Sequence, residues 1–156
     1  MIRLPSCASL PPTDASTSDP TTWLSNNDIG KFLAAISARQ VMLVSDSCFS
    51  GTLAKEQALA PTANLSRQEI LARRTVAVMS SGGEEPVSDE GKDGHSIFAW
   101  NFIRQLRAIP EHSTGAPFFD KVKQAVQAEY PQQPRYGAAK QAGHMEGGDY
   151  LLEVRK

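Results

Sequence analysis

Two short apolar runs constrain the fold more than any other feature of this sequence. They are Val41-Met42-Leu43-Val44 and the segment Thr75–Met79. Both runs are strand-sized and continuous rather than alternating, which is typical of strands that are covered on both faces, as in parallel sheets. The sequence therefore predicts two buried strands at the centre of the fold.

Segments with helical periodicity alternate with these strands. A helix is predicted over residues 26–38, with Ser25 as its N-cap. Further helices are predicted after the cap residue Ser96 and over residues 118–130, and residues 149–154 are expected to form a terminal strand. This alternation predicts an α/β fold in which helices flank a largely parallel sheet.

The charge balance excludes several classes of partner. Sixteen Lys and Arg residues face seventeen Asp and Glu residues in 156 positions, so no overall positive field attracts nucleic acid or an anionic membrane surface. No apolar run approaches the ~20 residues that cross a bilayer. Pro5, Pro11 and Pro12 interrupt any apolar run that a secretory signal would need. The compartment is unknown from the sequence, and these absences favour the cytoplasm.

The composition also divides the chain. Residues 1–22 hold four of the ten prolines and are interpreted as an irregular lead-in to a single folded region, residues 23–156. Within that region, residues 53–74 carry four Lys and Arg residues against two acids, and are interpreted as a linker or a weak, solvated helix.

The two cysteines, Cys7 and Cys48, cannot form a disulfide framework, and no Cys/His cluster predicts a zinc site. Cys48 follows the strand Val41–Val44, and loops beyond the carboxyl ends of such strands collect functional groups. Cys48 is therefore a candidate nucleophile, although a buried structural cysteine fits its position equally well. Its neighbour Asp46 disfavours a thiolate, so a nucleophilic Cys48 needs a histidine from elsewhere in the fold.

The residues around Cys48 also carry a family resemblance. Asp46-Ser47-Cys48-Phe49-Ser50-Gly51 resembles the D-x-C-x-S-G signature of metacaspases and bacterial caspase-like cysteine peptidases, which share the caspase fold. Further similarity follows in the family's order, from Trp23 to the end of the chain. It includes Ser80–Asp89, Gly94–Phe98, Gln133-Pro134 and Gly147–Tyr150.

The resemblance implies a cysteine-type endopeptidase. Cys48 would attack the peptide carbonyl to form an acyl-enzyme, and its own N–H would contribute to the oxyanion hole. Asp46 would form the acidic floor of the pocket for the residue before the scissile bond, which favours Arg or Lys. Ser81 and Ser88 would line the same pocket, or else act only as turn residues. Where the family often has a second cysteine, this chain has Gly83.

No cofactor or metal is expected. Asp89-Glu90-Gly91-Lys92-Asp93-Gly94 is superficially similar to a calcium-binding EF-hand loop. The loop lacks a ligand at Gly91, and Trp100 stands where a bidentate Glu is required, so no calcium site is predicted.

The family's catalytic histidine has no counterpart in this sequence. In the family that base belongs to a His-Gly dipeptide about 50 residues before the cysteine, and no His-Gly occurs in this chain. All three histidines follow Cys48. His95 is interpreted as a capping or packing residue at a helix start, His112 as a loop residue, and His144 as part of the approach to the last strand. We therefore expect an incomplete caspase-like domain that lacks its N-terminal strands and is inactive alone.

Two other functions remain open from the sequence. The chain could be a non-catalytic caspase-like module that binds peptides or proteins, because a fold does not fix a function. It could also be an unrelated α/β domain such as a serine hydrolase, although no GxSxG motif is present. As a peptidase, it would act on segments that contain basic residues. Self-cleavage within residues 53–74 is then a further expectation, unless the basic residues there are only solvated surface charges.

Overall fold

The structure is a computed structural model that describes residues 8–9, 19, 24–46, 59, 65–83 and 90–154. Its elements, in chain order, are β1 (Ala8–Ser9), β2 (Leu24–Ser25), α1 (Asn26–Ala35), β3 (Gln40–Ser45), α2 (Arg67–Ala72), β4 (Thr75–Ser80), α3 (Ile97–Arg107), β5 (His112–Thr114), α4 (Gly115–Glu129), β6 (Arg135–Ala138), a 3₁₀ turn (Lys140–Ala142) and β7 (Leu151–Glu153). None of the described helices has the length and apolar character that a membrane-spanning segment needs.

The central sheet of the described residues has the strand order β3-β4-β6. β3 and β4 are parallel, in a register that runs from Gln40 opposite Thr75 to Ser45 opposite Ser80. β6 is antiparallel to β4 and places Arg135 opposite Ser80. Two small antiparallel sheets, β1-β2 and β5-β7, lie apart from it. The α/β architecture predicted from the sequence is confirmed, and the sheet contains both a parallel and an antiparallel pair.

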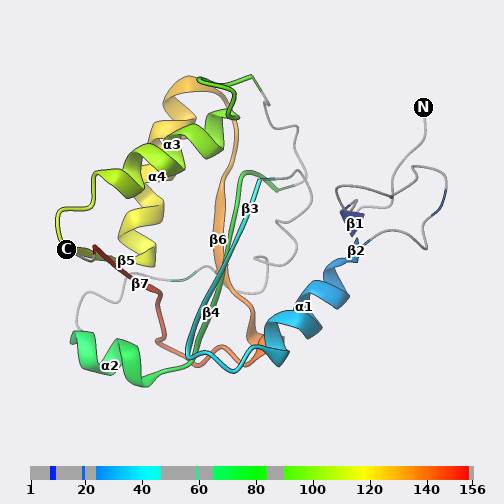
Figure 1. Cartoon of the computed structure of the whole chain (residues 1–156), viewed down its shortest axis with the longest axis vertical. Coiled ribbons are helices and arrows are strands. Elements are labelled where there is room, and N and C mark those ends of the chain that lie inside the picture. The colour runs from blue at the N-terminus through cyan, green and yellow to red at the C-terminus, as the bar shows by residue number, and fades with distance from the viewer. Residues whose placement is uncertain are drawn as a thin grey trace.

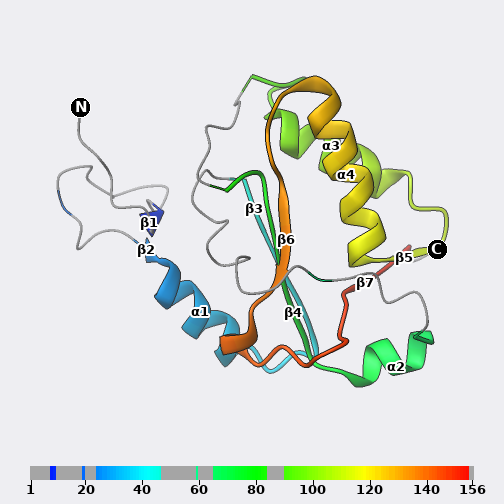
Figure 2. The same ribbon diagram turned by 180° about the vertical axis from the view of Figure 1, so that it is seen from behind.

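Helices pack on both faces of the central sheet (Figure 1; Figure 2 shows the opposite side). All six residues of β4 are buried. Ala77 and Met79 belong to the core formed with α3 and α4. Val76 and Val78 belong to a second core that includes Leu33 of α1. Alternate side chains of one strand therefore support two helical layers, which explains why the apolar run is continuous.

A buried carboxylate organises the start of α4. The N-cap residue Thr114 makes no side-chain cap bond. Instead, Asp149 is fully buried and accepts hydrogen bonds from Ala116 N (3.1 Å), the Tyr136 hydroxyl (2.7 Å) and Tyr150 N (2.8 Å). Burial, together with the neighbouring Asp149, raises the pKa of Tyr136 well above its ordinary value, so this hydroxyl stays a donor. The segment before β7 is thereby fixed against α4.

Arg74 has a similar role at the carboxyl end of α1. Its guanidinium donates to the carbonyls of Leu33, Ile36 and Ala38 at the carboxyl end of that helix, and to Ala142 O of the 3₁₀ turn. The last turn of α1 contains no basic residue of its own. A side chain next to β4 therefore satisfies the free carbonyls of a helix that is distant in sequence.

Several sequence predictions need adjustment at their boundaries. The helix expected over residues 26–38 ends at Ala35, and Arg74 donates hydrogen bonds to the carbonyls at that end. The helix expected over 118–130 begins at Gly115. His112 was predicted in a loop, which is wrong, because it lies in β5 and pairs with Glu153 of β7. The described part of the 53–74 segment contains α2, which begins with a Ser66–Glu69 capping box.

We expect Asp149→Asn to lower the free energy of unfolding by about 2–3 kcal/mol, because a buried carboxylate with three donors loses its charge and one acceptor oxygen. Urea denaturation measures the loss. Asp120→Asn is the matched control, since Asp120 is exposed on α4, and should stay within about 0.5 kcal/mol of the parent chain. Equal effects of the two changes would contradict the assigned role of Asp149.

Candidate functional site

The candidate site lies at the carboxyl ends of β3 and β4, at the top of the sheet in Figure 1. The parallel register brings these two ends together, and Ser81 N donates a hydrogen bond to Ser45 O (3.0 Å). Asp46 and Ser81 are the first residues beyond the two strands. Two of the four residues predicted to form the site therefore lie at one edge of the sheet, where loop residues of such sheets bind ligands.

Asp46 is exposed, and one of its two carboxylate oxygens accepts a hydrogen bond. Its Oδ2 accepts a hydrogen bond from the Ser96 hydroxyl at 2.5 Å. Ser96 is also the N-cap of α3, because its Oγ accepts from Ala99 N at 2.9 Å. The carboxylate that the resemblance predicts at the pocket floor is thus hydrogen-bonded to the residue that begins a helix.

Ser81 occupies a different environment from Asp46. It is fully buried, and its carbonyl accepts a hydrogen bond from Nε2 of the buried Gln132 (2.6 Å). This bond connects the end of β4 to the segment that follows α4. The predicted role of Ser81 in a pocket wall stays a prediction, while Cys48 and Ser88 lie outside the described residues.

A tight turn over Gly91–Ser96 places Ser96 next to Asp46. His95 N donates to Lys92 O (3.0 Å), and Asp93 and Gly94 adopt positive φ angles of 53° and 76°. A Cβ at Gly91 would lie 2.2 Å from His95 O and 2.4 Å from the carbonyl carbon of Ser96. The turn therefore depends on a glycine at this position, because the chain passes directly against its own backbone.

Gly83 has a role that sequence reasoning missed. A Cβ at Gly83 would lie 2.5 Å from Nε of Arg135, so the guanidinium occupies the space that a side chain at position 83 would fill. The only signal in the sequence was the glycine itself, where the resemblance implies a cysteine. Arg135 is exposed at the start of β6, beside the same edge of the sheet.

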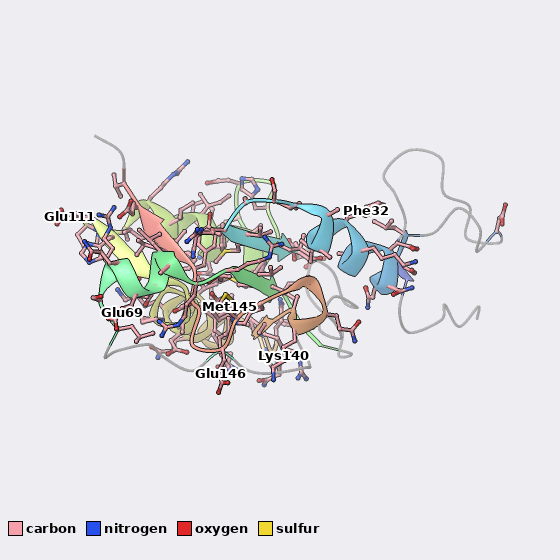
Figure 3. The ribbon with its side chains drawn as sticks, turned by 90° about the horizontal axis from the view of Figure 1, so that it is seen from below. Phe32, Glu69, Glu111, Lys140, Met145 and Glu146 are labelled. Carbon is pink, nitrogen blue, oxygen red and sulfur yellow. The ribbon has the colours of Figure 1, made fainter. Side chains whose placement is uncertain are left out.

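The three histidines are spread over the molecule. His95 is exposed, and it directly precedes the Ser96 that binds Asp46. Its predicted capping role belongs to Ser96. His112 is exposed in β5. His144 directly precedes Met145, which Figure 3 labels in its view from below, and its Nδ1 accepts from Val76 N (3.2 Å) near the start of β4.

His144 is separated from the site by most of β4. Val76 and Ser80 are four residues apart on that strand, which corresponds to about 13 Å. Burial lowers the pKa of His144, and its contact with Val76 N uses the neutral ring as an acceptor. The contact to β4 is therefore structural. Among the described residues, no group of three or more His, Cys, Asp or Glu is arranged to hold a metal ion.

Comparison with known proteins identifies the family. A family model described as the caspase domain matches residues 10–144. The match includes the predicted nucleophile, all three strands of the central sheet and the turn before α3. It confirms the resemblance to a caspase-like cysteine peptidase domain. No curated protein and no solved structure gives a significant match to the chain.

We expect Gly91→Ala to destabilise the chain by about 1–3 kcal/mol, because the added methyl group meets backbone atoms that cannot move independently. Gly30→Ala is the contrasting variant. Gly30 lies inside α1 with no atom within 4 Å of the added carbon, so alanine there should stabilise the chain by about 0.5–1 kcal/mol. Chemical denaturation of both variants measures the difference, and equal shifts would contradict the close approach at Gly91.

We expect His144 to make stability depend on pH. Its pKa is lowered from the ordinary value of 6.5 in the folded chain, so the unfolded chain binds the proton first. The stabilising contribution is present above pH 6.5 and declines as the pH falls through the lower, folded pKa. Denaturation between pH 7.5 and about pH 5 should show a smaller decline for His144→Gln than for the parent. The exposed His112 provides a control variant, His112→Gln, and equal slopes in both variants would refute this assignment.

Proposed function

Because the chain belongs to the caspase domain family, we propose that it is a cysteine-type endopeptidase domain with Cys48 as nucleophile and Asp46 as the acid of its substrate pocket. Membership of the family supports a cysteine-peptidase-like function in general. The observation that carries the proposal is the position of Asp46, which is exposed at the carboxyl edge of β3 and held by Ser96. Cys48 follows it by two residues.

The proposed substrates are peptide segments that contain Arg or Lys. A fixed carboxylate at the floor of a pocket attracts a guanidinium or ammonium group, and it can accept charge-assisted hydrogen bonds from either. A neutral side chain of the same shape could donate hydrogen bonds but would leave the negative charge of the carboxylate uncompensated in the complex. Cleavage is therefore proposed to occur after a basic residue.

The proposed chemistry is acyl transfer through a thioester. The Cys48 sulfur attacks the carbonyl carbon, the C–N bond breaks, and the leaving amine takes up a proton. Water then attacks the thioester carbonyl, which releases the acid and restores the thiol. Both steps need a base that accepts and returns a proton, and in cysteine peptidases a histidine has this role.

We further propose that these 156 residues alone bind substrate without turning it over. The sequence contains no His-Gly dipeptide, and His112 and His144 make contacts away from the edge that carries Asp46. His95 lies beside that edge, before Ser96, and we propose for it the packing role at the helix start that the resemblance implies. The second candidate function follows from the same observation. A pocket that has the proposed acid and lacks a base would serve as a binding site for basic peptides.

The contacts of the basic residues in the 53–74 segment limit the positions at which we propose self-cleavage. Arg74 donates to carbonyls from α1 and from the 3₁₀ turn, Arg73 donates to Glu69 O (3.2 Å), and Arg67 forms an ion pair with Glu153. Cleavage there would break contacts that hold the fold together. Lys55, which lies outside the described residues, is therefore the proposed position for cleavage.

Affinity labelling tests the proposed pocket without requiring turnover. The chain is treated at about pH 8.5, where an ordinary thiol is half ionised, with an arginyl chloromethyl ketone or with its neutral citrulline analogue. Mass spectrometry then follows alkylation of Cys48 and Cys7 separately. We expect the arginyl reagent to alkylate Cys48 about tenfold faster than the citrulline reagent, which corresponds to ~1.4 kcal/mol. Cys7 should react equally with both.

Two substitutions complete the labelling experiment. Asp46→Asn should abolish the arginine preference at Cys48, and Asp120→Asn should preserve it. Absence of any preference in the parent chain would refute the basic-residue pocket. Hydrolysis of an arginyl amide that depends on Cys48 would instead refute the proposal that these residues are inactive alone, and would establish the peptidase.

A further inference from the structure

The hydrogen bond between Ser96 and Asp46 joins residues that are 50 positions apart in the sequence. We infer that Ser96 is a positioning residue, which orients the Asp46 carboxylate so that one defined oxygen faces the basic side chain of the substrate. The inference rests on the proposed function, because it concerns the same pocket.

The Ser96 hydroxyl makes two different contacts at once. Its single proton is donated to Asp46 Oδ2 (2.5 Å), and one of its lone pairs accepts from Ala99 N (2.9 Å). The second contact fixes the position of the oxygen at the start of α3. The donated proton then has a defined direction, and so does the carboxylate oxygen that accepts it.

Comparison with the other helices shows that this contact differs from ordinary capping. Ser25 and Ser66 also cap helices, and each donates its proton to an acid three residues later in its own helix, Asp28 or Glu69. α3 has no acid in its first turn, since Ala99 occupies that position. The Ser96 proton is directed instead to Asp46, at the end of a strand.

The start of α3 is a firm support for this contact. Ile97 and Phe98 are buried directly after Ser96, and Asn101 Nδ2 donates to Ile97 O (2.9 Å). The Phe98 ring stacks on Phe102, with centroids 6.2 Å apart. Movement of Ser96 would therefore disturb the main core. Through Ser96, the core fixes the position of the Asp46 carboxylate.

This arrangement leaves one oxygen of Asp46 for a ligand. Oδ2 is occupied by Ser96, whereas Oδ1 has no hydrogen-bond partner within the described part of the chain, and the residue is exposed. A carboxylate that is already oriented loses less freedom when a cation binds than one that rotates in water. Ser96 should therefore increase the preference for a charged side chain over a neutral one of the same shape.

The test compares three serine variants by the ratio of Cys48 alkylation rates with the arginyl and citrulline chloromethyl ketones. Ser96→Ala should reduce this ratio about fivefold, in line with the loss of one hydrogen bond to a carboxylate. Ser96→Thr keeps the hydroxyl and should restore most of the ratio. Ser66→Ala removes an equivalent helix cap from α2 and should leave the ratio unchanged.

The citrulline rate and the melting temperature separate positioning from a general loss of structure. If Ser96→Ala lowers both rates together, or if Ser66→Ala lowers the ratio as much, the positioning role is wrong. If Asp46→Asn lowers the ratio to about one and Ser96→Ala does not change it, the inference fails and the proposed pocket stands. If the parent chain shows no arginine preference, the proposed function itself fails.

Discussion

The burial of β4 on both faces is the constraint on which the rest of the structure depends. Its six residues have no exposed surface, and its alternate side chains form the centres of two cores. A strand buried in this way must satisfy its backbone groups with neighbours on both edges, and β3 and β6 provide them. The parallel pairing with β3 then brings Asp46 and Ser81 together at the carboxyl ends of the two strands. The site is therefore a geometrical consequence of how the core is packed.

Long-range polar contacts complete the helices that pack on this sheet. α4 has no capping side chain at its own N-cap, and α1 has no basic residue in its last turn. Asp149 and Arg74 supply the missing partners from distant positions. Because buried polar groups need partners, each contact fixes the chain segment that provides it. This explains how the segment from β6 to β7, which contains only short elements, takes a defined place against the core.

The sequence predicted the features that depend on local patterns. Val41–Val44 and Thr75–Met79 lie within β3 and β4, and Ser96 caps a helix as expected. Features that depend on distant partners could not be predicted. α4 begins early because Asp149 caps it, and β5 forms because β7 lies opposite. In the candidate site, the motif predicted a role for Asp46, but no local pattern indicates that Ser96 would donate to it or that the Arg135 guanidinium would lie against Gly83. The roles of Asp46, Cys48, Ser81 and Ser88 stay predictions.

Recognition and chemistry depend on different parts of this molecule. Asp46 and Ser96 are positioned by β3 and α3, which belong to the main body of the fold. A catalytic base contributes to the chemical step, by moving a proton in the transition state, and contributes little to ground-state binding of the substrate side chain. In the proposed function, absence of the base therefore lowers turnover and leaves the proposed selection of a basic side chain intact. If the proposed pocket is correct, this caspase-family domain discriminates between peptides whether or not it cleaves them.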